Sequence, residues 1–327
     1  MQVQDLRVEL PVDGTVYPAV DGVSFTLAAG ECVAIVGESG SGKTQLARAL
    51  LGLPPEAAMI SGRFAYAGRE LFELSENQWR GVRGGEIGLV FQEPAGAFDP
   101  VQTIGAQIRE AISLHRPVSR SQARAIAVGA LRDVAFPDPE SALGEYAHRL
   151  SGGLRQRAFL ALTLAPGPKV LLADEPTASL DSTVAAQVLD LLDRLRAERG
   201  LGVLLITHDL GIVARRSDRV LVLYAGRVVE EAATADLFRA PSHPYTRGLL
   251  ASVPRLRSTG RRDGERYAAI PGALADLSTR PRGVCAFAPR CPERFEPCEV
   301  REPPPFPAPS GQARCFLYEN ASPEAAR

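Results

Sequence analysis

The sequence predicts an α/β fold built on a parallel sheet, and two features of its pattern carry this prediction. Short apolar runs rich in β-branched residues recur between residues 32 and 206, as in strands buried on both faces. Segments with helical spacing of apolar residues lie between these runs, which is the alternation that a parallel sheet produces. The first run, residues 32–37, leads directly into a glycine-rich loop, and that loop directs the search for function.

The composition is that of an ordinary globular protein. Of the 327 residues, 45% are hydrophobic and 23% charged, and the net charge is −1. There is no basic excess of the kind that favours nucleic-acid binding. No apolar run approaches the ~18 residues that span a bilayer, and the first ten residues lack the apolar core of a secretory signal. We expect a cytoplasmic protein that binds no nucleic acid and meets a membrane only through a partner.

Residues 1–31 predict a small antiparallel sheet beside the core. VQDLRVEL alternates apolar and polar residues, and VSFTL follows as a second strand. Asp13-Gly14 and Asp21-Gly22 are turn signals. An N-terminal antiparallel β subdomain is therefore expected.

The loop GESGSGKT, residues 37–44, matches G-x-x-x-x-G-K-[ST], the phosphate-binding P-loop. Its backbone N–H groups, at the start of a helix, form a site for an anion. Lys43 can reach the outer phosphates, and Thr44 can offer its hydroxyl to Mg²⁺. A plain Gly/Ser turn is the alternative, but strand, loop and helix follow in the order that the motif requires. The predicted nucleotide-binding residues here are Gly37, Glu38, Ser39, Gly40, Ser41, Gly42, Lys43 and Thr44.

The middle of the chain contains two further polar signals. The strand pattern GEIGLVFQEP ends at Gln92, which is either a ligand for Mg²⁺ or water, or simply a polar strand end. Helical patterns then dominate, and we expect a helical subdomain at about residues 93–165. In LSGGLRQR, Ser151 is expected to be a helix N-cap. Gly152 and Gly153 would make a second anion-binding turn at the start of that helix, and the pattern does not identify the anion.

Acidic residues follow the next predicted strand. A parallel strand that ends at Asp174 of KVLLADEP would put a carboxylate near the metal of a P-loop site, and Glu175 could polarise a water. Paired acids after a strand also occur by chance, but their position after a P-loop favours the functional role. An amphipathic helix ends at Gly200. His208 then follows another strand, at the edge of a parallel sheet where ligands bind, although a lone histidine is more often structural. A hairpin around Ala225-Gly226 and two short helices close this part near residue 253.

The tail, residues 254–327, differs in composition. A charged stretch and the proline-rich REPPPFPAP surround four cysteines spaced C-x5-C-x6-C-x16-C. This spacing is not that of a zinc ribbon, and disulfides are disfavoured in a reducing compartment. A metal centre is the preferred reading, with free thiols and disulfides as alternatives. The four are Cys285, Cys291, Cys298 and Cys315, whereas Cys32 lies in a predicted core strand.

Taken in order, these motifs resemble those of the ATP-binding subunits of ABC transporters. The ordered set is GESGSGKT, the Gln of VFQEP, LSGGLRQR, LLADEP, SLD and THD, and it covers essentially the whole chain. LSGG is the specific member, because other P-loop ATPases lack it. The resemblance implies a P-loop NTPase core within an ATPase domain at residues 1–253. It also implies head-to-tail pairs of ATPase subunits that enclose two ATP molecules and drive transmembrane partners by hydrolysis.

The resemblance assigns a role to each matching position. It makes Glu175 the general base and lets His208 hydrogen-bond the γ-phosphate. Residues 37–44 wrap the phosphates of ATP, while Ser151, Gly152 and Gly153 contact the γ-phosphate of ATP on the other subunit. The implied catalytic residues are Glu175, His208, Gln92 and Lys43. The implied Mg²⁺ ligands are Thr44, Gln92 and Asp174, and the implied dimer-interface residues are Ser179, Leu180 and Asp181.

A narrower resemblance covers the tail. HPYTRGLLASVPRL, IPG and CAFAPRCPERFEPC resemble the C-terminal extension of dipeptide and oligopeptide importers, in some of which four cysteines hold an iron–sulfur cluster. It implies a [4Fe–4S] cluster on Cys285, Cys291, Cys298 and Cys315, within an extension at residues 254–327.

The implied function is peptide import at the cytoplasmic face of the membrane. The implied partners are two permease subunits, a second ATPase subunit, identical or related, and a solute-binding protein. Nickel or another small solute is the alternative cargo. A soluble ABC ATPase acting on DNA or ribosomes is less favoured, because neither a coiled-coil insertion nor a second ATPase domain is present.

One position departs from the family pattern. The family has an aromatic residue stacked on adenine near the end of the first strand, where this chain has Leu10. Tyr17 is nearby, seven residues later. We therefore expect adenine to rest on an aliphatic surface.

Overall fold

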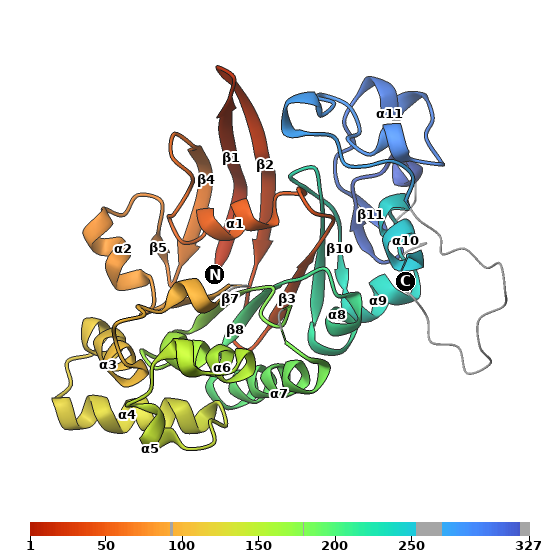
Figure 1. Ribbon diagram of the computed structural model, residues 1–327. Coiled ribbons are helices and arrows are strands. Elements are labelled where there is room, and N and C mark those ends of the chain that lie inside the picture. Colours follow the sequence, from red (N-terminus) through yellow and green to blue (C-terminus); the bar gives the residue numbers. More distant parts are fainter. Residues whose placement is uncertain (92–93, 179, 253–269, 321–327) are drawn as a thin grey trace, which may run out of the picture. The chain divides into compact units, whose positions relative to one another are not determined.

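The computed structural model describes residues 1–91, 94–178, 180–252 and 270–320 (Figure 1). The chain divides into two compact units. The unit that carries the glycine-rich loop, called here the P-loop unit, comprises Gln2–Thr26, Val33–Ala65 and Thr207–Arg327. The other, called the helical unit, comprises Met1, Leu27–Cys32 and Tyr66–Ile206. None of the helices in the described ranges is long and apolar enough to cross a membrane.

An antiparallel sheet opens the P-loop unit. β1 (Gln2–Val12) pairs with β2 (Thr15–Thr26) on one side and with β4 (Met59–Tyr66) on the other (Figure 1). Asp13 and Gly14 form the turn between β1 and β2, as predicted. The predicted antiparallel β subdomain is thus confirmed.

The second turn signal of this region, Asp21-Gly22, is wrong, because both residues lie inside β2. The register between β1 and β2 shifts on both sides of Leu6, so the pairing of the two strands is irregular there. Gly22 has φ 69°, a backbone conformation that glycine adopts readily at such a position. Asp21 is buried and pairs with Arg7 and Arg227, so the acid serves a packed ion pair instead of a turn.

The main sheet of the P-loop unit has the order β11-β12-β10-β9-β3. β3 runs parallel to β9, and β10 returns antiparallel to β9 through the predicted hairpin at Ala225-Gly226. β12 and β11 come from the tail and extend the sheet beyond β10. The strands are β3 (Cys32–Val36), β9 (Arg219–Tyr224), β10 (Arg227–Ala233), β11 (Phe306–Ala308) and β12 (Gly311–Ala313).

Short helices accompany this sheet. α1 (Lys43–Ala49) begins at Lys43, within the last two residues of the glycine-rich loop. The other helices of this unit are α8 (Leu210–Arg216), α9 (Thr234–Arg239), α10 (Pro244–Ala251) and, in the tail, α11 (Glu296–Val300). The tail is otherwise loop-rich, as expected, with single turns of 3₁₀-helix at Leu277–Thr279, Ala288–Arg290 and Phe316–Tyr318. The domain boundary at residues 253/254 stays a prediction.

The helical unit contains three parallel strands in the order β8-β7-β6. β7 is buried up to its last residue, as a strand covered on both faces should be. The strands are β6 (Ile87–Val90), β7 (Val170–Asp174) and β8 (Gly202–Ile206), and a two-residue strand, β5, is Arg69–Glu70. The parallel α/β core is therefore confirmed.

Helices fill the predicted helical range, and their ends follow from local sequence. α4 begins at a capping box of Ser119 and Gln122, and α7 ends at Gly200, which has φ 63°. α3, α4 and α6 pack on one another. The helices are α2 (Glu76–Val82), α3 (Ile104–His115), α4 (Arg120–Asp133), α5 (Pro139–Ala142), α6 (Gly152–Leu164) and α7 (Ser182–Arg199), with 3₁₀ turns at Pro94–Ala97 and Ala147–Arg149.

Candidate functional site

The glycine-rich loop joins the buried strand β3 to α1, and its glycines are required by close backbone approaches. A Cβ at Gly37 would lie 2.2 Å from the carbonyl oxygen of Leu223. A Cβ at Gly42 would lie 2.5 Å from the carbonyl oxygen of Ala19, and Gly42 has φ 110°. Only glycine combines that space and that backbone conformation. The loop is fixed as well by the amide of Gly226, which donates to the carbonyl of Ser41 at 2.8 Å.

Lys43 is the cation of the loop. Its Nζ donates to the carbonyl oxygens of Gly37, at 2.7 Å, and Glu38, at 3.0 Å. Lys43 is also the first residue of α1, and Thr44 beside it is exposed. The ammonium group of Lys43 therefore lies against the backbone of the loop at a helix start, where backbone N–H groups can bind phosphate.

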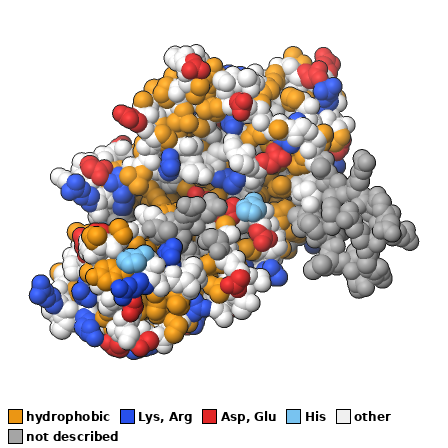
Figure 2. All heavy atoms as spheres, viewed as in Figure 1, with side chains coloured by type: hydrophobic (Ala, Val, Ile, Leu, Met, Phe, Trp, Pro, Cys, Tyr) orange, Lys and Arg blue, Asp and Glu red, His pale blue; other side chains and the backbone are white. Residues whose placement is uncertain are grey.

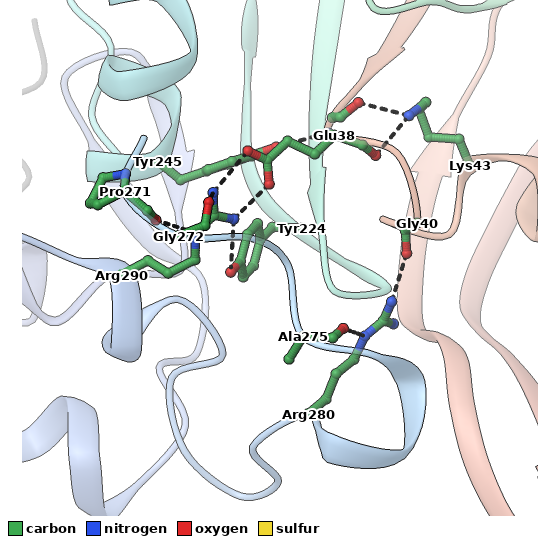
Figure 3. Close-up of polar contacts among 11 residues, drawn as sticks. Glu38, Gly40, Lys43, Tyr224, Tyr245, Pro271, Gly272, Ala275, Arg280 and Arg290 are labelled. Atoms are coloured by element: carbon green, nitrogen blue, oxygen red, sulfur yellow. Dashed lines mark hydrogen bonds and ion pairs between the residues drawn. The ribbon is translucent and has the colours of Figure 1, made fainter. Parts of the chain in front are cut away.

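Residues distant in sequence hold the loop from outside, and the motifs did not predict them. Tyr245 accepts a hydrogen bond from the amide of Glu38, Arg290 pairs with the carboxylate of Glu38, and Arg280 donates to the carbonyl of Gly40 (Figure 3). Tyr245 lies in HPYTRGLL, the segment that the sequence singled out without a role. Every one of these contacts lies within the P-loop unit.

His208 also belongs to the P-loop unit. It is exposed in a short turn whose two flanking residues are fixed. The amide of Thr207 donates to the carbonyl of Ile35 at 3.2 Å, and the carboxylate of Asp209 caps α8 by accepting from the amides of Gly211 and Ile212. The imidazole is therefore presented from a rigid turn that is tied to β3.

Asp174 and Glu175 belong to the helical unit. Asp174 is the last residue of β7, and its Cα is paired with that of Ile206. Glu175 has φ 50°, a left-handed conformation uncommon for a residue other than glycine, and its amide donates to the carbonyl of Ile206 at 2.8 Å. Such strained positions, which cost on the order of 1–3 kcal/mol, gather at functional sites.

The LSGG segment starts α6, and the predicted N-cap is confirmed. The Oγ of Ser151 accepts from the amide of Leu154 at 3.4 Å. The Nε2 of Gln156, a buried side chain on the same helix, donates to the carbonyl of Pro176 at 2.8 Å. α6 is thus tied to the segment that directly follows Asp174 and Glu175.

The predicted interface and metal residues are only partly described. Asp181 caps α7 by accepting from the amides of Thr183 and Val184, both at 3.0 Å, and Leu180 is half-buried. Gln92 and Ser179 lie outside the described residues. Thr44 lies in one unit and Asp174 in the other. The interface roles and the Mg²⁺ set therefore stay predictions.

Leu10, at the expected adenine position, is not isolated from aromatic residues. Leu10 and Tyr17 are directly paired across β1 and β2. The guanidinium carbon of Arg282 lies 4.5 Å from the centre of the Tyr17 ring, and Arg282 also donates to the carbonyl of Val16 at 3.1 Å. The predicted turn at Asp13-Gly14 lies midway in sequence between Leu10 and Tyr17. A hairpin that folds at this turn therefore places the two residues opposite each other.

The four tail cysteines are gathered but do not form a ready metal site. The amide of Cys285 donates to the carbonyl of Cys298 at 3.1 Å. Burial, with smaller effects from neighbouring thiols, raises the pKa of Cys285 to about 11 and that of Cys315 to about 12. Cys291 is shifted in the same direction, and all four are free thiols. Among the described residues, no three His, Cys, Asp or Glu side chains are arranged to hold a metal ion.

Charges of both signs are interspersed on the face drawn in Figure 2. Red acidic and blue basic side chains alternate there with hydrophobic ones.

Comparisons with known proteins agree over nearly the whole chain. The ABC transporter family model matches residues 20–178, and the model for the C-terminal region of oligopeptide/dipeptide transporters matches residues 229–298. The oligopeptide transport ATP-binding protein AppD of Bacillus subtilis is 44% identical over 312 residues, covering 94% of this chain and 93% of AppD. The dipeptide transport ATP-binding protein DppD of the same organism is 43% identical over 301 residues, covering 91% and 88%. Among solved structures, the dimeric ATP-binding cassette MJ0796 in a post-hydrolysis state bound to ADP and Pi matches with TM-score 0.64 and 26% identity, over 71% of this chain and 98% of that one.

Proposed function

This chain belongs to the ATP-binding subunits of ABC transporters, in the group of oligopeptide and dipeptide transport ATP-binding proteins, and from that premise we propose that it hydrolyses ATP to power peptide import across the cytoplasmic membrane. The observation that carries the ATPase activity is the loop geometry. Lys43 stands at the start of α1, in a loop whose close-packed backbone is possible only with glycine at residues 37 and 42. We assign it to the outer phosphates of ATP.

We assign the hydrolytic step to Glu175 and His208. Glu175 takes the proton of the attacking water, and His208 hydrogen-bonds the γ-phosphate. Thr44, Gln92 and Asp174 would hold Mg²⁺, which would supply positive charge to offset that of the phosphates. The left-handed backbone at Glu175 supports this assignment, because strained positions of this kind gather at functional sites.

We assign the LSGG segment to a second subunit's nucleotide. Ser151, Gly152 and Gly153 would contact ATP held by the P-loop of the partner, with Ser179, Leu180 and Asp181 at the interface. The dimeric form of the matched cassette MJ0796 supports this arrangement. The partner is either a second copy or a related ATPase.

Peptides are the proposed cargo. The relatives that match over nearly the whole chain are named for oligopeptide or dipeptide transport, and this favours peptides over nickel or another small solute. The complete importer would contain two permease subunits and a solute-binding protein, with this chain at the cytoplasmic face of the membrane.

The deciding experiment reconstitutes the chain in proteoliposomes with two permeases, its ATPase partner and a solute-binding protein. We expect ATP turnover to rise when di- to pentapeptides are supplied and to remain basal with nickel. Stimulation by nickel alone would overturn the peptide assignment, and absence of basal turnover would overturn the ATPase itself.

We also propose that Cys285, Cys291, Cys298 and Cys315 take up a metal centre, a [4Fe–4S] cluster in the form the resemblance implies. The support is that all four thiols lie in the tail and that each of the other three raises the pKa of Cys315 electrostatically. The arrangement described above would need to tighten around the metal. Protein purified without oxygen should be brown, with about four iron atoms per chain. A colourless preparation that contains zinc would overturn the cluster.

A further inference from the structure

Glu38, the second residue of the glycine-rich loop, is held at three points (Figure 3). Its amide donates to the hydroxyl of Tyr245 at 2.9 Å. Its carbonyl accepts from Nζ of Lys43 at 3.0 Å. Its carboxylate accepts two hydrogen bonds from Arg290, at 2.6 and 3.0 Å. Backbone and side chain of one loop residue are therefore fixed together with the loop's cation.

Arg290 is itself held on every side. Its Nε donates to the carbonyl of Pro271 at 2.8 Å, and one Nη donates to the carbonyl of Gly272 at 3.2 Å. The other Nη lies 3.4 Å from the hydroxyl of Tyr224. Its side chain is only 8% exposed. A paired guanidinium and carboxylate, with the remaining donors satisfied, is a rigid and directional contact.

A second arginine, Arg280, contacts the glycine-rich loop at Gly40, two residues after Glu38. Arg280 donates to the carbonyl of Gly40 at 2.6 Å and to that of Ala275 at 3.3 Å. A methyl carbon of Leu274 lies 3.6 Å from where a Cβ of Gly40 would be. Residues 271–290, called here the clasp, therefore contact the glycine-rich loop at both Glu38 and Gly40 (Figure 3).

We propose that the clasp is a working part of the nucleotide site, with Arg290 as the residue that positions the P-loop through Glu38. A loop that wraps phosphates with its backbone loses conformational entropy when it binds them, and a loop already fixed loses less. Arg290 holds the residue whose carbonyl holds Lys43, so it sets the starting position of that cation. The inference rests on the proposed binding of ATP by this loop.

The clasp also connects the loop to the cysteines. Arg290 ends the 3₁₀ turn Ala288–Arg290, whose first amide donates to the carbonyl of Cys285 at 3.0 Å. The amide of Cys291 donates back to the carbonyl of Ala288 at 3.3 Å. The turn that bears the positioning arginine is thus enclosed by two of the four cysteines.

The test uses the full chain with Arg290→Gln. We expect the Kd for ATP, measured with a fluorescent ATP analogue, to rise about ten-fold, within the range common for coupled sites. The KM should rise in step while kcat at saturating ATP stays near that of the unmodified chain. The matched control is Arg301→Gln, because Arg301 pairs with Glu319 at 2.7 Å in the same tail but on an exposed surface. The control should bind ATP as the unmodified chain does.

A double-mutant cycle separates positioning from general stability. If Arg290 acts through Glu38, then Glu38→Gln combined with Arg290→Gln should bind ATP no more weakly than Arg290→Gln alone. Additive losses, or unchanged ATP affinity in Arg290→Gln, would overturn the inference.

Two further readouts keep the result interpretable. Arg290→Lys keeps the charge but not the paired geometry, so it should also raise the Kd for ATP. Arg290→Lys is the variant to use if Arg290→Gln does not fold. A fall in the Tm of Arg290→Lys without any change in its Kd for ATP would overturn the inference. Failure of the unmodified chain to bind ATP would instead overturn the proposed function.

Discussion

The amide of Tyr245 donates a hydrogen bond to Nδ1 of His243, 3.0 Å away, and both side chains are buried. The imidazole accepts this bond, so it must be neutral. Burial, reinforced by the charge of Arg247, lowers the pKa of His243 to about 3. The carboxylate of Glu230 completes the site by accepting from the amides of Ser242 and His243, both at 2.8 Å.

Acid should therefore destabilise the fold through His243. The folded pKa of about 3 lies below the ordinary value of 6.5, so the unfolded chain takes up the proton first as the pH falls. The contribution of His243 is complete above pH 6.5 and is lost between 6.5 and 3, at up to about 1.4 kcal/mol per pH unit. Urea unfolding at pH 7 and pH 5.5 measures this loss.

The control for that experiment is His243→Asn, which can accept the same hydrogen bond and does not titrate. Its free energy of unfolding should fall less over the same pH interval. Burial also lowers the pKa of His115, but that group titrates in both proteins. Equal losses in the two proteins would contradict the assignment to His243.

Gly42→Ala should damage the fold at the glycine-rich loop. The added Cβ would meet the carbonyl of Ala19 at 2.5 Å in a backbone conformation that alanine disfavours. We expect the free energy of unfolding to fall by more than about 3 kcal/mol, measured by thermal or urea unfolding. Gly14→Ala is the matched control, because Gly14 also has a positive φ but nothing within 4 Å of its Cβ position, and it should cost only about 1 kcal/mol. Equal costs would show that the contact with Ala19 is unimportant.

Glu175→Gln should separate hydrolysis from binding. The amide cannot take a proton from water, so we expect ATP turnover to fall by at least about 100-fold while ATP binding persists. Turnover is measured as phosphate release and binding with the fluorescent analogue. Glu198→Gln, on the exposed face of α7, should leave both unchanged. Residual turnover of about a tenth or more in Glu175→Gln would exclude it as the general base.

Leu10→Tyr should tighten nucleotide binding. A second ring beside Tyr17 adds a stacking surface worth about 0.5–1.5 kcal/mol, or roughly two- to ten-fold in Kd. Leu10→Ile, which adds no ring, serves as the control. An unchanged Kd in Leu10→Tyr would mean that adenine is held away from this position.

The sequence predicted those features of the fold that depend only on residues close together in the chain. Apolar periodicity located the strands and helices, and Ser151 and Gly200 marked helix ends because capping depends on a few neighbouring residues. Asp21-Gly22 was misread, because the same dipeptide suits a turn or an irregular strand position, and the choice depends on the partner strand.

The clasp could not be predicted from local patterns. Arg290 and Glu38 are 252 residues apart, and an ion pair between distant residues leaves no periodicity in either segment. Pro271 and Gly272 act through their carbonyl groups, which every residue type possesses. The cysteines were identified by their spacing, but spacing does not determine how closely their sulfur atoms approach.

The tail strands have a consequence for aggregation. β12 covers the outer edge of β10 from Glu230 to Ala232, and β11 in turn covers β12. β11 has three residues, its central Pro307 has no amide hydrogen, and three prolines at 303–305 precede it. Such an edge offers little to another strand, whereas a bare β10 would expose unpaired amides and carbonyls. The proline-rich stretch therefore hinders the edge of this sheet from pairing with a strand of another molecule. A chain cut before residue 270 should aggregate under conditions in which the full chain stays in solution.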